Sequence, residues 1–229
     1  MRKPLNTLLK RFGYEIVKIS KFPELLRKRY ETVSDFTFVQ IGANDGIRFD
    51  NLYSFVTERK CRGIVVEPLP DFYERLCMNY RDSPSIKPIR AAVHPTQRKC
   101  KLYRIDPKRL HELPPWAAGI ASFDPNHYKK SRTPDEYIIE EEVDALPLME
   151  LIEMGGFTSL DLLQTDTEGF DAEVIRMIDF DRIVPAIIKY EHSNLAAGDK
   201  ASVEALLRGK GYRLFYEKDD AIAVQQGAV

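Results

Sequence analysis

The chain has 229 residues, of which 44% are hydrophobic and 30% are charged, with 12 Gly and 14 Pro. This is the composition of a globular protein with a sizeable core, and it excludes collagen, a disordered chain and a coiled coil. No apolar stretch approaches the ~18 residues of a membrane span, and we expect no signal peptide at the start. Three cysteines without a C-x-x-C spacing argue against disulfides and zinc, so we expect a cytoplasmic protein.

Charge is distributed unevenly along the chain. Residues 1–30 carry nine Lys or Arg and two acidic residues, whereas the remainder carries 25 basic and 33 acidic residues. An acidic body argues against nucleic acid as a partner, because that recognition depends on neutralising phosphates. We expect a basic helical extension over 1–33 and one domain over 34–229. The extension either packs on the domain or makes a peripheral contact with an anionic membrane surface.

After two opening helical patterns, the hydrophobic pattern alternates between strands and helices. The sequence predicts helices at about 5–12, 23–32, 51–59, 71–80, 147–154, 172–178 and 202–210. It predicts strands at about 36–41, 63–67, 86–93, 160–165 and 183–190, and an antiparallel hairpin over 212–216 and 221–225. Strands that alternate with helices in this way indicate a parallel sheet with crossover helices.

The middle of the chain is less regular. Residues 100–105 alternate in polarity, which favours an edge strand, and 137–143 favour another strand. Residues 106–136 show no clear period and contain the only tryptophan, Trp116. An irregular stretch of this length in a compact domain is usually functional or disordered. With Phe123 and Tyr128 nearby, we expect this stretch to be a lid over the substrate.

A turn with two glycines follows the first predicted strand, where residues 40–46 read Gln-Ile-Gly-Ala-Asn-Asp-Gly. Ligands of doubly wound sheets bind at this carboxyl end, and Gly42 and Gly46 allow a tight turn and close approach. The spacing matches neither the dinucleotide fingerprint nor a P-loop. Glu67 ends the next strand, where an acidic residue commonly accepts hydrogen bonds from ribose hydroxyls. Turn and acid together predict a nucleoside-containing cofactor without pyrophosphate recognition.

Three further polar residues follow later strands. Asp166 and Glu168 come directly after a predicted core strand, and two acids there repel each other unless a cation is near. His192 follows the next strand and is the natural general base near pH 7. We therefore expect Asp166, Glu168 and His192 to be catalytic. No spacing is typical of a metal site, and the sequence leaves open whether a divalent metal binds these residues.

These motifs together resemble the FkbM family of S-adenosyl-L-methionine-dependent methyltransferases. The resemblance covers about residues 36–217 and depends on residues 38–46, 65–68 and 166–171. It implies an α/β, Rossmann-like class I methyltransferase with N-terminal helices and a seven-stranded, mostly parallel sheet that ends in an antiparallel hairpin. It also implies O-methylation of a hydroxyl on a sugar, glycan or polyketide-like metabolite, with S-adenosyl-L-methionine as the cofactor.

The resemblance also implies which residues touch the cofactor. They are Gln40, Gly42, Ala43, Asn44, Asp45 and Gly46 at the methionine end, Glu67 at the ribose, Ala91 and Ala92 near the adenine, and Asp166. Many family members have Asp where this chain has Gln40, so Asp45 is the alternative acidic contact.

Two other functions are consistent with the sequence. Asp166-Thr167-Glu168 resembles the acidic pair with which many glycosyltransferases hold a metal and a sugar nucleotide. A non-catalytic cofactor-binding module that docks a partner through its basic extension is the other alternative.

As a methyltransferase, the protein is expected to act on a small-molecule or glycan acceptor. An oligomer is consistent with the sequence.

Overall fold

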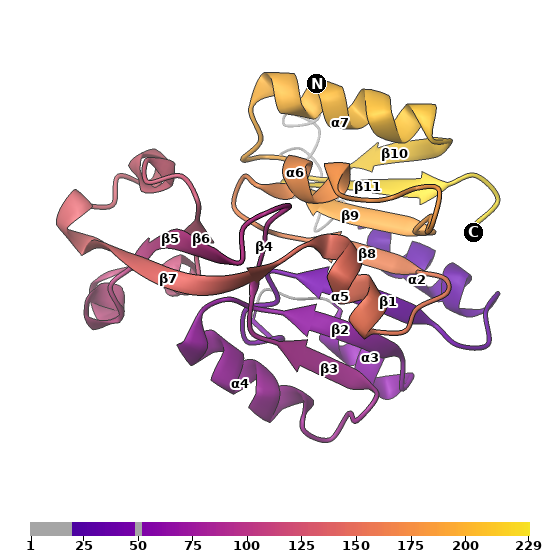
Figure 1. Ribbon diagram of the computed structural model, residues 1–229, viewed down its shortest axis with the longest axis horizontal. Coiled ribbons are helices and arrows are strands. Elements are labelled where there is room, and N and C mark those ends of the chain that lie inside the picture. The colour runs from indigo at the N-terminus through magenta and orange to yellow at the C-terminus, as the bar shows by residue number, and fades with distance from the viewer. Residues whose placement is uncertain (1–19, 49–51) are drawn as a thin grey trace, which may run out of the picture.

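The computed structural model describes residues 20–48 and 52–229, and a seven-stranded sheet forms its centre (Figure 1). The spatial order of the strands is β10 (Tyr212–Tyr216), β11 (Asp220–Gln225), β9 (Ile187–Glu191), β8 (Leu162–Thr165), β1 (Thr37–Ile41), β2 (Arg62–Val66) and β3 (Ile86–Ile89). All pairs are parallel except those of β11, which runs antiparallel to β9 and β10. The predicted mostly parallel sheet with an antiparallel C-terminal hairpin is confirmed.

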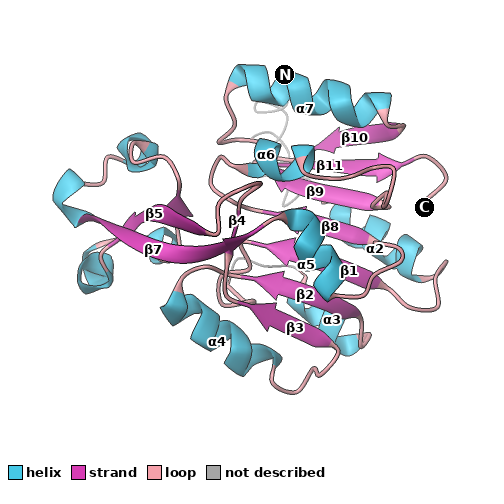
Figure 2. Ribbon diagram, in the orientation of Figure 1, coloured by secondary structure: helices cyan, strands magenta, loops and turns pink. Residues whose placement is uncertain are grey.

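Helices cover both faces of this sheet (Figure 2). One face carries α2 (Phe22–Tyr30), α3 (Tyr53–Glu58) and α4 (Pro70–Tyr80), and the other carries α5 (Leu148–Met154), α6 (Asp171–Arg176) and α7 (Ala197–Gly209). Strand residues point alternately to the two faces, so Phe38 packs with the first group of helices and Val39 with the second. Burial on both faces explains why residues 63–66 of β2 form a continuous apolar run rather than an alternating one.

The direction of chain progression reverses between β1 and β8. From β1 the chain adds β2 and β3 on one side, and β8 and β9 then add on the other side. In open α/β sheets, ligands bind in the crevice at the carboxyl ends of the strands at such a switch point. The fold therefore places the binding crevice where Gly42 and Asp166 follow β1 and β8.

The middle of the chain forms a second sheet, which corrects two predicted strands. Its spatial order is β4 (Ala92–Val93), β7 (Ile138–Leu146), β5 (Lys99–Ile105) and β6 (Ala121–Ser122). The single strand predicted over 86–93 is wrong, because β3 stays in the main sheet whereas β4 pairs with β7. The edge strand predicted over 100–105 is also wrong, because β5 pairs with β7 on one side and β6 on the other. Alternating polarity in a sequence indicates which face of a strand is exposed. It does not reveal which other strands pair with that strand.

Between β5 and β7 lies an insert of short elements, which projects beside the main sheet (left in Figure 1). It contains η1 (Pro107–Glu112), η2 (Pro115–Ala117), β6, η3 (His127–Ser131) and η4 (Asp135–Tyr137). The buried guanidinium of Arg104 in β5 contacts Asp71 of α4 at 2.7 and 2.9 Å and Glu141 of β7 at 2.8 Å. These charge-assisted bonds dock the second sheet on the main domain.

Part of the expected N-terminal extension belongs to the packed core. In α2, Phe22, Leu25 and Leu26 are buried against the main sheet. Arg29 of the same helix contacts the buried Asp161 at 2.7 Å. The helix predicted at 5–12 and most of the basic extension lie outside the described residues. No helix of the described residues is long and apolar enough to cross a membrane.

Candidate cofactor and acceptor site

A cavity of about 360 Å³ lies at the carboxyl ends of the central strands. Its lining contains most of the predicted site residues: Gln40, Gly42, Ala43, Asn44, Glu67, Ala91, Ala92, Asp166 and Glu168. Three predicted site residues, Asp45, Gly46 and His192, are not part of this lining. The structure thus brings the glycine turn, the acid that follows β2 and the acidic pair that follows β8 around one volume.

The turn after β1 uses all its own amide donors. Gly42 N and Ala43 N donate to Val66 O, Asn44 N donates to Glu67 Oε2, Asp45 N donates to Asn44 Oδ1, and Gly46 N donates to Ala43 O, all within 2.8–3.0 Å. Gly42 has a φ of +74°, and a Cβ there would stand 1.9 Å from the carbonyl oxygen of Asp166. Asn44 also adopts a positive φ of 52°. The turn is therefore closed on itself and offers no spare N–H group to a ligand.

Glu67 sits beneath this turn as a nearly buried carboxylate, 4% exposed. Its Oε2 accepts from Asn44 N at 2.9 Å and its Oε1 accepts from Leu69 N at 3.0 Å. Burial raises the pKa of Glu67 to about 7, against the lowering effect of the two N–H groups and of Arg104. Each oxygen keeps a second lone pair, so the carboxylate can accept two hydroxyl donors from the cavity.

Asp45 and Gly46 shape the turn from outside the cavity. One oxygen of Asp45 accepts from Ile47 N at 3.0 Å and from Arg48 N at 2.8 Å. Gly46 packs so closely on α4 that a Cβ would stand 2.7 Å from the ring of Tyr80. The family resemblance assigned both residues to the methionine end. In the structure, Gly42, Ala43 and Asn44 line the cavity, and the chain then turns away from it at Asp45 and Gly46.

The acidic pair after β8 lies at the other end of the cavity. Protein surrounds the side chain of Asp166 on most sides, but its open side faces the cavity, where solvent reaches it. Burial raises its pKa well above the ordinary value, and the negative charges of Glu168, Asp171 and Glu191 raise it further. Burial and the charge of Glu168 likewise raise the pKa of Glu191 to about 7. Such a cluster favours an incoming cation or a proton.

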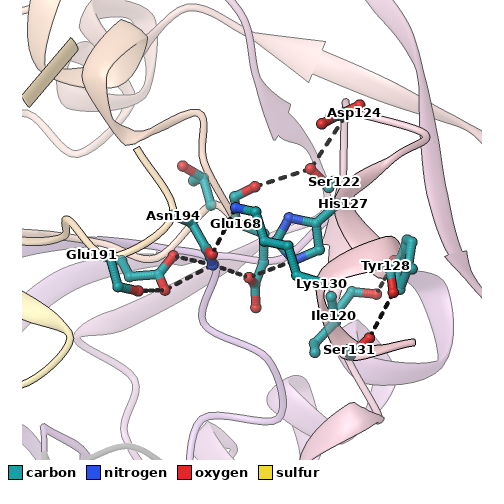
Figure 3. Close-up of polar contacts among 12 residues, drawn as sticks. Ile120, Ser122, Asp124, His127, Tyr128, Lys130, Ser131, Glu168, Glu191 and Asn194 are labelled. Carbon is teal, nitrogen blue, oxygen red and sulfur yellow. Dashed lines mark hydrogen bonds and ion pairs between the residues drawn. The ribbon is translucent and has the colours of Figure 1, made fainter. Parts of the chain in front are cut away.

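Two side chains hold Glu168 in place, as Figure 3 shows. Asn194 Nδ2 donates to Glu168 Oε2 at 2.9 Å, and His127 Nε2 lies 3.1 Å from the same oxygen. Asn194 Nδ2 also contacts Glu191 Oε1 at 2.9 Å. Glu168 has a φ of 52°, in the left-handed region that few residues other than glycine adopt. His127 carries no motif in the sequence, and only the tertiary structure reveals this contact.

His192 lies apart from the cavity. Its backbone N–H donates to Asp219 O at 2.9 Å, and its ring packs edge-on against the ring of Tyr216 at 5.5 Å. The strand β9 ends one residue before His192, and the chain then turns toward the loop between β10 and β11. Its predicted role as the base stays a prediction, whereas the other two predicted catalytic residues, Asp166 and Glu168, line the cavity.

A row of polar side chains completes the floor of the cavity, and the sequence analysis named only Gln40 of its three members. Gln40, Gln164 and Lys189 lie side by side on β1, β8 and β9 and all line the cavity. Lys189 Nζ contacts Asp220 at 2.8 Å and lies 5.5 Å above the ring of Phe22. A lysine inside the buried strand Ile187–Glu191 was the available signal. Polar residues at such buried positions require a partner or a ligand.

The insert supplies the roof. Trp116, Ile120 and Phe123 line the cavity, and Trp116 remains 51% exposed. Gly119 approaches Asn44 so closely that a Cβ there would stand 2.0 Å from Asn44 Nδ2. Tyr128, expected in the lid, is instead buried, and its hydroxyl contacts two backbone carbonyl oxygens at 2.6 and 2.9 Å. Within the described ranges, no group of three or more His, Cys, Asp or Glu could hold a metal ion.

Comparison with known proteins agrees with this geometry. The sequence pattern of the methyltransferase FkbM domain matches residues 40–214. No curated protein matches. Solved structures that are similar include the Methanococcus jannaschii fibrillarin pre-rRNA processing protein, with 12% identity over 84% of this chain and 67% of that chain and a TM-score of 0.43. Precorrin-6y C5,15-methyltransferase from Geobacter metallireducens has 11% identity over 91% of each chain and a TM-score of 0.42.

The N-terminal domain of human METTL16 in complex with SAH has 12% identity over 97% of this chain and 80% of that chain, with a TM-score of 0.45. These scores are too low for the solved structures to indicate an activity. The FkbM match, by contrast, extends from β1 to β10 and includes the turn, Glu67 and the acidic pair. The chain therefore belongs to the methyltransferase FkbM domain family, and it is an S-adenosylmethionine-dependent methyltransferase.

Proposed function

We propose that this methyltransferase acts on a hydroxyl oxygen of a small-molecule or glycan acceptor, such as a sugar or a polyketide-like metabolite. One observation carries the proposal: a single cavity has the buried carboxylate of Glu67 at one end and the acidic pair Asp166 and Glu168 at the other. The carboxylate of Glu67 suits the hydroxyls of a ribose. The acidic pair at the other end suits a base, which accepts the proton that the hydroxyl loses during methylation.

The residues of the cavity fit S-adenosylmethionine. Glu67 keeps two lone pairs for the ribose hydroxyls, and Ala43, Ala91 and Ala92 give small apolar walls for the adenine. Asp166 lines the same cavity, and its carboxylate suits the positively charged part of the cofactor. When bound, the cofactor supplies an electrophilic methyl group on a sulfonium. The acids aid binding more than the chemical step, because the positive charge disappears during transfer.

The carboxylate of the cofactor's methionine moiety needs a donor, and we propose Lys189. The five N–H groups from Gly42 to Gly46 are already bonded within the protein, so the turn cannot supply one. Among the described residues that line the cavity, only Arg48 and Lys189 are cationic. The side chain of Arg48 is 56% exposed, whereas that of Lys189 is 18% exposed. A carboxylate gains most from the less solvated cation.

Glu168 is the proposed proton acceptor, with Asp166 beside it. A positioned base contributes typically ~10²–10⁴-fold to such a reaction. The protein's larger task is alignment of donor and acceptor, which is worth up to ~7–11 kcal/mol. Trp116 and Phe123 in the roof provide aromatic faces on which a sugar or a flat metabolite can rest. These faces support the proposed acceptor class.

Neither alternative function gains support from the structure. For the glycosyltransferase, Asp166 and Glu168 would have to hold a metal, but the described residues contain no group of three or more His, Cys, Asp or Glu that could do so. The family match also explains the glycine turn and Glu67, which a sugar-nucleotide enzyme leaves unexplained.

For the compartment, we propose the reducing cytoplasm, because Cys61, Cys77 and Cys100 are all free thiols.

The proposal is tested in two steps. Thermal unfolding is first measured with S-adenosylmethionine, S-adenosylhomocysteine, NAD, and UDP plus Mn²⁺. A ligand at 100 times its Kd stabilises by ~2.7 kcal/mol, and we expect this only for the two sulfur compounds. Transfer of a radiolabelled methyl group is then measured to monosaccharides, oligosaccharides and hydroxylated macrolactones, with amines and thiols as comparison. Stabilisation by UDP plus Mn²⁺ alone contradicts the proposal, and cofactor binding without transfer to any hydroxyl indicates a binding module.

A further inference from the structure

The insert touches the acidic end of the cavity through two side chains. Ser122 Oγ donates to the carbonyl oxygen of Glu168 at 2.9 Å, and His127 Nε2 lies 3.1 Å from Glu168 Oε2. The side chain of His127 is only 11% exposed, and its ring stands edge-on to the ring of Tyr128. Because Tyr128 is buried and hydrogen-bonded within the second sheet and insert, η3 holds His127 against Glu168.

The two oxygens of Glu168 have different surroundings. His127 and Asn194 both contact Oε2. Among the described residues, no side chain makes a polar contact with Oε1. Glu168 lines the cavity, so Oε1 is the oxygen available to an acceptor. The left-handed backbone of Glu168 is unfavourable by about 1 kcal/mol or more for a residue with a side chain. The contacts with Ser122, His127 and Asn194 hold the residue in that conformation.

The charges around this pair are mainly negative. Asp166 precedes Glu168 on the same loop, and Glu191 of β9 shares Asn194 with it. Lys130 of η3 contacts the amide oxygen of Asn194 at 3.2 Å. The charge of Glu168 raises the pKa of both Asp166 and Glu191. A hydrogen-bond donor on Oε2 offsets part of the negative charge that Glu168 shares with these acids, and Nε2 of His127 lies within hydrogen-bond distance to give one.

We infer that His127 is a positioning residue for methyl transfer, which donates from Nε2 to Oε2 of Glu168 so that Oε1 can take a proton from the acceptor. This inference rests on the proposed function. In the step, the acceptor O–H bond breaks and the proton goes to Oε1. The oxygen's electron pair forms the new C–O bond while the S–C bond breaks and leaves its pair on sulfur. The positive charge of the sulfonium and the negative charge of Glu168 disappear together, so charge balances.

The insert therefore does more than form the roof, because Ser122 and His127 also position the base. It reaches the cofactor turn at Gly119 and the base at Ser122 and His127. The ion pairs of Arg104 that dock the second sheet therefore also hold the base's partner in position. The roof and the contact that orients the base thus depend on the same docking of the second sheet.

A first experiment needs no acceptor. The chain has four histidines, so ¹⁵N-labelled histidine gives four pairs of imidazole signals, and the pair of His127 is the one lost in His127→Gln. With S-adenosylhomocysteine bound, we expect a proton on Nε2 of His127 that exchanges slowly with water, and fast exchange in Glu168→Gln. An unprotonated Nε2, or signals that do not change in Glu168→Gln, would overturn the inference whatever the acceptor is.

A second experiment uses any acceptor that the wild type methylates. We expect kcat to fall ~10²-fold or more in Glu168→Gln and about 10-fold in His127→Ala, with affinity for S-adenosylhomocysteine within twofold. His127→Gln, which keeps a donor near Nε2, should stay within about threefold. The double variant should be no slower than Glu168→Gln alone, because His127 acts only through Glu168.

The matched control is His111→Ala, in the same insert, where the histidine is 76% exposed. It should leave kcat unchanged. Independent losses in the double variant, or equal losses in His127→Gln and His127→Ala, overturn the positioning role. If the wild type methylates no hydroxyl while the NMR contact is present, the proposed function fails and the contact is structural.

Discussion

The carboxylate of Glu67 accepts the backbone N–H of Asn44 at 2.9 Å, so the residue that suits the ribose also holds the turn that lines the cofactor cavity. Glu67 is 4% exposed, and it is anchored on its other side by Leu69 N at 3.0 Å. One side chain thus joins the carboxyl ends of β1 and β2. Because of this double role, the protonation of Glu67 affects both the stability of the fold and the binding of the cofactor.

Glu67 should make the cofactor-free protein less stable as the pH rises. Its pKa is about 7 in the folded state and about 4.5 when unfolded, so the folded state holds the proton more tightly. Its contribution is present in full below pH 4.5 and is lost as the pH rises through 7. Between pH 5 and pH 8, we expect the free energy of unfolding of the wild type, relative to Glu67→Gln, to fall by about 2–3 kcal/mol. Urea unfolding at both pH values measures it.

The control for this experiment is Glu58→Gln, a carboxylate that is 71% exposed. Its difference from the wild type should change by less than about 0.5 kcal/mol over the same pH range. At pH 8, Glu67→Gln should also weaken S-adenosylhomocysteine binding by about 1–3 kcal/mol, because the ribose loses a charged acceptor. A parallel pH dependence in wild type and Glu67→Gln would show that Glu67 does not titrate in this range.

Gly42→Ala should destabilise the fold itself. The Cβ would stand 1.9 Å from the carbonyl oxygen of Asp166 at a φ of +74°, so the turn and β8 must separate. We expect a loss of more than about 2 kcal/mol in free energy of unfolding, measured without cofactor. Gly198→Ala in α7 is the matched control, because nothing lies within 4 Å of its Cβ position. That change should leave stability unchanged or raise it by up to about 1 kcal/mol.

Asp166 should make S-adenosylmethionine bind more tightly as the pH rises. The pKa of Asp166 is raised by burial and by three neighbouring acids, and a cationic ligand beside it should lower that pKa and so release protons on binding. Titration calorimetry in buffers of different ionisation enthalpy should detect the released proton. The pH dependence should be smaller in Asp166→Asn and smaller for uncharged methylthioadenosine. Equal pH dependence for both ligands would place the cation away from Asp166.

Lys189→Met should weaken S-adenosylhomocysteine binding by about 10–100-fold, the value of a charge-assisted hydrogen bond. Methylthioadenosine lacks the carboxylate, so its affinity should stay within about threefold. Arg48→Met, which removes the more exposed cation of the lining, is the control and should leave both affinities within threefold. Equal weakening of both ligands would mean that Lys189 supports the cavity only through Asp220 and Phe22.

His192→Ala should retain turnover within about threefold, because His192 lies outside the cavity lining and packs on Tyr216. Glu168→Gln, measured with the same acceptor, should lose ~10²-fold or more. A loss of ~10²–10⁴-fold in His192→Ala with unchanged cofactor affinity would restore the histidine that follows β9 as the base.

The main sheet, and the site residues that directly follow β1, β2 and β8, can be predicted from the local sequence. Apolar runs that end in Gly42, Glu67 and Asp166 mark the strands, and in a parallel sheet the carboxyl ends of neighbouring strands meet at one edge. Proximity of these residues therefore needs only the strand order. His192 also follows a strand, but the register of β11 with β9 and the turn after Glu191 take it away from the cavity.

Residues of the second sheet and the insert could not be assigned in this way. Positions 86–93 look like one strand, yet β3 and β4 belong to different sheets, because strand polarity does not specify a partner. The contact of His127 with Glu168 joins segments that share no motif and meet only when Arg104 docks β5 on α4. Local pattern thus determined the fold class, the cofactor turn and the acidic pair, since these depend on periodicity and on where strands end. Only tertiary packing decided which histidine meets the base and which cation faces the cavity, since both depend on long-range pairing.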